Sequence, residues 1–261
     1  MWKVKNSITL QDHEMVNERT FNTVLWERRF MLLATFTTLL GFVLFVGAVA
    51  TNYWVIITFT GAHQDNIKLL IGIWGEWQKT WNETHRKSRW LGHFPEPPPD
   101  SIRLGADELP HFYRAQAAFS GIGLVIMVVS NLVAIYCFMR NRYAYKRLVA
   151  CVHFVAAMCV VIVIEVLAHS VDEWHVMNKT PSSNAMPLNP NSTVLETVEF
   201  RYITITNFDY SYGFSLIASW VVVGLYIFGA VVFAVASRKR KGSRAATMEF
   251  EFDDRPVNIG R

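Results

Sequence analysis

The sequence contains few cysteines and few charged residues. Its three cysteines, Cys137, Cys151 and Cys159, all lie inside long apolar runs, so the segments between those runs can hold no disulfide of their own. Charged residues make up 18% of the chain and hydrophobic residues 52%, which is more apolar than an ordinary soluble domain. The net charge of +4 is small and gives no reason to expect a nucleic-acid partner. We therefore expect a membrane protein.

Catalytic signatures are missing as well. The eight histidines are scattered, and no His-Glu-x-x-His, paired-carboxylate or nucleophile arrangement occurs. The cysteines have no metal-binding partner set and are typical of small buried residues, with palmitoylation of Cys137 and Cys151 as the alternative. We expect no enzyme, no metal and no cofactor.

Four stretches are long enough to cross a bilayer, which takes about 20 apolar residues. Their bounds are residues 30–53, 115–139, 148–170 and 212–236. The only Asp, Glu, Lys or Arg inside them is Glu165 in the third. Because the runs are apolar nearly all round, unlike the helices of a soluble bundle, the sequence predicts an α-helical membrane protein with a bundle of four transmembrane helices.

Lysine and arginine decide the expected orientation. Arg28 and Arg29 precede the first span, the short connection 140–147 is basic, and a basic cluster follows the fourth span. Such clusters stay in the cytosol, so both termini are expected there, in a multi-pass protein of the plasma membrane. The predicted cytosolic segments are residues 1–29, 140–147 and 237–261, and the predicted outer segments are residues 54–114 and 171–211.

Three glycosylation sequons agree with this orientation. They begin at Asn82, Asn178 and Asn191, and all three fall in the predicted outer segments. These asparagines are the candidate glycosylation sites of a membrane glycoprotein.

Both outer segments contain strand-like stretches. Residues 52–58 are β-branched and aromatic, residues 68–81 are typical of one or two further strands, and residues 194–205 partly alternate between apolar and polar. The first outer segment is also too long for a bare connection. We expect these strands to form one small extracellular antiparallel β-sheet on the outer ends of the helices.

Two features are candidates for partner contact. Residues 71–81 carry Trp74, Trp77 and Trp81, which are either buried in the sheet or offered to a partner. Glu165 is the one acidic residue inside a span, where an ionisable group is costly. It either reaches interfacial water or a hydroxyl of a neighbouring helix, or contacts the transmembrane helix of a partner.

The order of these elements resembles the superfamily of claudins, peripheral myelin proteins and voltage-gated calcium-channel γ-subunits. Trp54 stands just past the first span, as a tryptophan does in that family, and Gly72-Ile73-Trp74 is similar to its Gly-Leu-Trp element. The residues around Glu165 and residues 210–215 resemble the γ-subunit (stargazin-like) branch more than the claudins. The resemblance implies a claudin-like fold.

The chain departs from the family pattern at the outer cysteine pair. The first family cysteine stands three residues beyond the tryptophan of Gly-Leu-Trp, where this chain has Trp77, and no cysteine occurs near the second position. A disulfide typically contributes about 2–4 kcal/mol to stability. We expect burial of Trp77 to fill part of that role.

The resemblance also implies a function. It favours a non-enzymatic auxiliary subunit that modulates gating or trafficking of a voltage-gated calcium channel or an ionotropic glutamate receptor. The alternatives are a claudin-like adhesion or paracellular-barrier protein that self-associates at a cell junction, and a membrane-organising protein with neither role. The expected partners are a pore-forming channel or receptor subunit and membrane lipids. The candidate contact residues are Trp54, Gly72, Trp74, Trp77 and Glu165.

Overall fold

The computed structural model describes residues 2–60, 65–82, 86–94, 109–139, 143–179 and 206–237. Its helices are α1 (Trp2–Ala50), α2 (Leu109–Met139), α3 (Tyr143–Lys179) and α5 (Phe214–Ala236). The parts long and apolar enough to cross a membrane are Leu25–Ala50, Pro110–Cys137, Ala144–Asp172 and Phe214–Ala236. Four such helices are what a multi-pass membrane protein requires, as predicted.

The helices form a closed bundle. α1 packs against α2 and α5, and α3 packs against the same two helices. Large apolar side chains such as Phe36, Val125 and Ile217 stay exposed on the bundle surface, as suits helices that face lipid.

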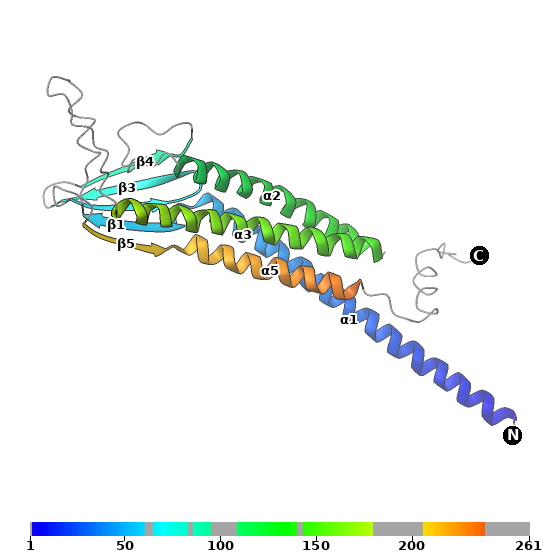
Figure 1. Ribbon diagram of the computed structural model, residues 1–261. Helices are drawn as coiled ribbons and strands as arrows, with labels where there is room; N and C mark the ends of the chain where they lie inside the picture. Colours follow the sequence, from blue (N-terminus) through cyan, green and yellow to red (C-terminus); the bar gives the residue numbers. More distant parts are fainter. Residues whose placement is uncertain are drawn as a thin grey trace, which may run out of the picture.

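α1 continues well beyond the bundle at its N-terminal end (Figure 1). Residues 1–29, which the sequence assigns to a cytosolic tail, are helical from Trp2 onward. This stretch contains neither proline nor glycine, so nothing in it interrupts the helix that starts in the bundle.

A five-stranded sheet lies at one end of the bundle (Figure 1). Its strands are β1 (Val55–Thr60), β2 (Asn66–Ile71), β3 (Gly75–Trp81), β4 (Arg86–Gly92) and β5 (Thr206–Tyr212). Their spatial order is β4-β3-β2-β1-β5, and all neighbours are antiparallel. The first connecting segment supplies a meander of four strands, and the second supplies β5 beside β1. The prediction of one small antiparallel sheet built from both segments is confirmed.

Some bounds differ from the prediction. Residues 68–81 form two strands with a tight turn between them, and β4 was not anticipated because Arg86-Lys87-Ser88-Arg89 lacks β-branched and apolar residues. The strand of the second segment begins at Thr206, and residues 194–205, where we expected it, lie outside the described residues. α3 already begins at Tyr143, inside the connection predicted over residues 140–147.

One apolar core joins the sheet to the helices. Ile57 and Leu69, on the side of the sheet that faces the bundle, belong to the same buried cluster as Leu167 and Val171 of α3. The sheet is therefore held by the bundle and is not a separate domain.

A polar network crosses the bundle. The amide of Asn131 on α2 donates to the hydroxyl of Tyr226 on α5 at 3.0 Å, and the hydroxyl of Thr38 on α1 donates to Asn131 Oδ1, also at 3.0 Å. The ring of His153 on α3 lies beside this network, with its centroid 5.5 Å from that of Tyr226. Asn131 is thus satisfied within the bundle, where such bonds tie helices together.

Candidate partner-binding surfaces

Trp54 connects the end of α1 to the sheet through hydrogen bonds. Its indole N–H donates to the Ala48 carbonyl near the end of α1 at 2.8 Å, and its backbone N–H donates to the Ile71 carbonyl of β2 at 3.0 Å. The Trp54 carbonyl accepts from the N–H of Gly213, just before α5, at 2.9 Å. The side chain is fully buried, so Trp54 is a structural contact within the chain.

Gly72 lets the turn between β2 and β3 approach the end of α1. A Cβ at this position would overlap Oδ1 of Asn52 and come within 2.8 Å of the Asn52 Cα, so only glycine fits. The Gly72 N–H donates to the Gly75 carbonyl at 2.9 Å and closes the turn. Trp74 in this turn is 46% exposed. The Gly-Ile-Trp element is therefore a tight turn against the helix end, with its tryptophan open to contact.

His93 fastens this turn to α2. Its backbone N–H donates to the Trp74 carbonyl at 2.9 Å, and its Nε2 lies 3.1 Å from the Gly72 carbonyl. Because a carbonyl only accepts, Nε2 carries the proton. The His93 ring also stacks on Tyr113 of α2, with centroids 4.0 Å apart and planes 7° from parallel. Sequence reasoning missed this contact, since an isolated His and Tyr in different segments form no recognisable spacing.

Trp77 does not replace the missing disulfide by burial. Its side chain is 39% exposed, so that hypothesis was wrong. Successive side chains of a strand point to opposite faces, and β3 turns Glu76 and Gln78 inward, where both are buried and Gln78 Nε2 donates to Glu76 Oε1 at 2.8 Å. Trp77 therefore faces outward. All three cysteines are free, and the contacts of His93 hold the turn without a covalent bond.

A tryptophan-rich surface covers the outward side of β2, β3 and β4. Alternation along the strands and register across them place its members on one side, and we call it the tryptophan face. Its residues are Lys68, Trp77, Lys79, Trp81, Arg86, Ser88 and Trp90. Trp77 and Trp90 are direct cross-strand neighbours and are 39% and 50% exposed. Clustered exposed apolar surface of this kind marks an interaction site.

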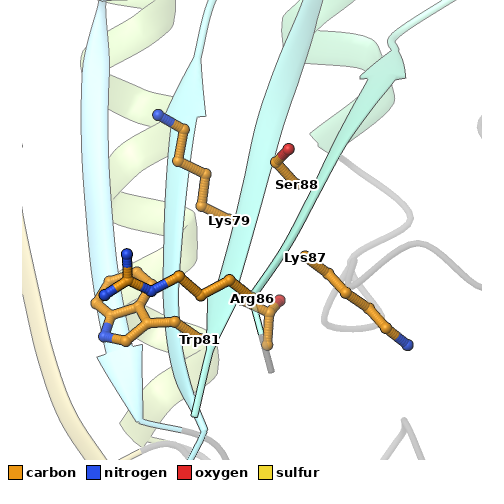
Figure 2. A pocket seen from close by; sticks show the side chains of 6 residues that line it. Lys79, Trp81, Arg86, Lys87 and Ser88 are labelled. Carbon is orange, nitrogen blue, oxygen red and sulfur yellow. The ribbon is translucent and has the colours of Figure 1, made fainter. Parts of the chain in front are cut away.

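A shallow pocket of about 360 Å³ lies on this hairpin, where β3 ends and β4 begins. It is lined by Lys79, Thr80, Trp81, Arg86, Lys87 and Ser88. Figure 2 shows Arg86 lying along the Trp81 ring with Lys79 on the same side, while Lys87 points away from them. The pocket therefore combines positive charge with an aromatic surface.

Glu165 lies on an exposed face of α3. Phe154 and Met158 precede it on that face and are 54% and 44% exposed, and His169 and Asp172 follow it at helical spacing and are exposed as well. Within the described part of the chain, no hydrogen bond or ion pair reaches the Glu165 carboxyl. A neighbouring helix therefore offers it no hydroxyl, which leaves interfacial water or a partner helix.

Asp172 marks where α3 reaches the sheet. Partial burial, then the neighbouring Tyr210, and then the negative charge of Asp172 raise the pKa of the Tyr212 phenol in β5, so Tyr212 stays neutral at physiological pH. Glu165 precedes Asp172 by about 10 Å along the helix, given a rise of about 1.5 Å per residue. It therefore lies about two turns inside the sheet end of the span.

Of the three sequon asparagines, Asn82 is the one whose side chain the structure describes. Asn82 is exposed directly after β3, beside the pocket. Asn178 belongs to the last turn of α3, but its side chain lies outside the described part, and Asn191 lies outside the described residues altogether. The exposure of Asn82 would allow a glycan there.

The described residues include no group of three His, Cys, Asp or Glu side chains that could hold a metal ion. Two exposed surfaces stand out among the described residues as candidates for partner contact, the tryptophan face and the face of α3 around Glu165. No family model matches the chain, and no curated protein matches it either.

Proposed function

We propose that the protein is a non-enzymatic auxiliary subunit of the plasma membrane that binds a pore-forming channel or receptor subunit through α3. The observation that carries this proposal is Glu165 exposed within a candidate membrane span, on the face of α3 where Phe154 and Met158 precede it. Ionisable residues in a span normally face the bundle interior, and an ionised one near the bilayer centre costs about 3 kcal/mol. A partner helix that presents a lysine, arginine or hydroxyl at the same depth would offset that cost, and only in the complex.

The proposed orientation follows from charge. The bundle end opposite the sheet (Figure 1) carries Arg28 and Arg29 and leads into the basic segment after α5, so we assign that end to the cytosol. The sheet is then extracellular. The exposed position of Asn82 at the sheet end supports this assignment.

The class of partner comes from the resemblance to γ-subunits, which suggests a voltage-gated calcium channel or an ionotropic glutamate receptor. An auxiliary subunit alters gating only if it binds one channel state more tightly than another. The shared core of Ile57, Leu167 and Val171 connects the sheet to α3, so a shift of one is transmitted to the other.

The test is co-purification of the tagged chain with a co-expressed calcium-channel or glutamate-receptor subunit in mild detergent. Glu165→Leu should reduce recovery of the partner about tenfold, because about 1.4 kcal/mol of lost polar contact changes affinity by that factor. Glu165→Gln should lose less, since the amide still forms hydrogen bonds. The control is Val125→Ala on the equally exposed surface of α2, which should change nothing. Equal recovery by all variants, or no recovery by any, would contradict the proposal.

A second candidate is self-association between cells, as in a claudin-like adhesion or paracellular-barrier protein. It is favoured by the exposed Trp77 and Trp90 on the sheet. The chain expressed alone in cells without such channels should then accumulate at contacts and cluster the cells. Trp77→Ala with Trp90→Ala should abolish this clustering, whereas Glu165→Leu should leave it intact. Absence of accumulation at contacts would exclude this function.

A further inference from the structure

We infer that the tryptophan face is a binding site for an acidic, sulfated oligosaccharide. The inference rests on the positive charge and the aromatic surface of β2, β3 and β4, and on the pocket between β3 and β4. It does not depend on the partner proposed for α3.

The charge of the face has one sign. Lys68, Lys79 and Arg86 lie on it, and no Asp or Glu of these three strands points to this side. Across all five strands, the one acidic residue on this side is Asp209 on β5, at the opposite edge of the sheet. An anionic ligand is therefore attracted to the β3–β4 edge.

Two of the cationic side chains are direct neighbours across adjacent strands. Lys68 stands directly opposite Lys79, so their Cβ atoms are about 5 Å apart, and like charges in this position destabilise a sheet. Arg86 is the diagonal neighbour of Lys79, at about 7–8 Å. A ligand with several negative groups would relieve this repulsion. One sulfated sugar unit or two adjacent ones carry groups at such spacing.

The aromatic surface is rigid. The indole of Trp90 lies across the cross-strand pair Gly75 and Gly92, and a Cβ on Gly75 would come within 2.8 Å of that ring. A large side chain over a glycine pair in a sheet is held in place by the backbone beneath it. Trp90 thus presents a preformed flat surface beside the exposed Trp77, which reduces the ordering cost of binding.

These features together select the chemical class. The C–H faces of sugar rings stack flat on indole rings, and sulfate or carboxylate groups pair with Lys and Arg. A run of acidic side chains, as in polyglutamate, would use the cations but would offer no flat surface to the open indole faces. The pocket of about 360 Å³ beside Trp81 falls within the range of small-ligand sites, about 300–1,000 Å³. A sulfated oligosaccharide uses every one of these elements.

The test measures binding of a size-defined heparin octasaccharide to the full chain in nanodiscs of neutral phosphatidylcholine, at several salt concentrations. All proteins carry Asn82→Gln, so that no glycan of the chain itself occupies the pocket beside it. Lys79→Gln with Arg86→Gln should weaken binding about tenfold and flatten its salt dependence, because fewer counterions are released. Trp81→Ala should weaken binding about fivefold or more, and Trp81→Phe should retain most of it.

The matched control is Arg89→Gln, which removes the same charge from the same strand on the opposite side and lies outside the pocket lining. It should change the affinity by less than about twofold, since exposed charges act weakly at a distance in salt. Four outcomes would overturn the inference: no binding at physiological salt, an equal loss in Arg89→Gln, equal binding of fully desulfated octasaccharide, or equal binding of polyglutamate or a single-stranded oligonucleotide. Retained size-exclusion profiles of the variants show that they are folded.

Discussion

At the residue scale, single atoms decide how the turn and hairpin of the sheet pack. Gly72 has no space for a Cβ beside Asn52, and Gly75 has none beneath Trp90. Gly47 of α1 has the same chemistry in open surroundings, with no atom near a Cβ built there. The same residue type is therefore indispensable at one position and neutral at another, which only the neighbouring atoms reveal.

Gly75→Ala should destabilise the protein by about 1–3 kcal/mol, because a Cβ would lie 2.6 Å from the Leu91 carbonyl and must push β4 away. Gly47→Ala should be neutral or stabilise the protein by up to about 1 kcal/mol, since alanine favours helix. Thermal unfolding in detergent, followed by tryptophan fluorescence, would measure both. Equal unfolding midpoints of the two variants would show that β4 does not pack as described.

At the scale of the elements, α3 has two roles on different sides. Its inward side carries Leu167 and Val171 into the core shared with the sheet, and its outward side carries Glu165. In the middle of the bundle, hydrogen bonds of Asn131 link α1, α2 and α5. This network ties the helices together without involving Glu165.

Asn131→Leu and Tyr226→Phe should be coupled by about 0.6 kcal/mol, and by no more than about 1.7 kcal/mol, the range found for hydrogen bonds between membrane helices. A double-mutant cycle in the free energy of unfolding measures this coupling. The control cycle pairs Asn131→Leu with Thr35→Val, because the Thr35 hydroxyl bonds only the Met31 carbonyl of its own helix at 2.9 Å. That cycle should be additive, and coupling of the same size in both cycles would argue against the network.

At the scale of the whole molecule, the sheet and the N-terminal extension of α1 lie at opposite ends of the bundle (Figure 1). The two ends of the molecule's long axis therefore differ in structure. The two proposed binding surfaces do not overlap, since the one on the sheet lies at the end of the bundle and the one on α3 lies along its side.

The proposed orientation predicts that Asn82 is glycosylated, because the sheet end would enter the compartment where glycans are attached. Asn82→Gln should remove one glycan and increase electrophoretic mobility, and Thr84→Ala should do the same by destroying the sequon. Enzymatic deglycosylation should then bring the wild-type chain to the mobility of fully deglycosylated variants. If neither substitution changed the mobility while the other sequons were occupied, Asn82 would not be a glycan site.

The amino-acid sequence determined the four apolar helices, because membrane crossing requires long uncharged runs. It also determined that the connecting segments form a sheet, because β-branched residues favour extended backbone. It also identified Glu165, since one acid in an apolar span is visible without any structure. The tertiary structure decided which side each residue faces. Trp54 and Trp77 belong to the same residue type in the same segment, yet one is buried and the other exposed, because strand register and contact with the helix ends set burial. His93 contacts Gly72 and Tyr113 only because the fold brings these separate segments together. Strand pairing likewise places Lys68, Lys79 and Arg86 on one side of the sheet.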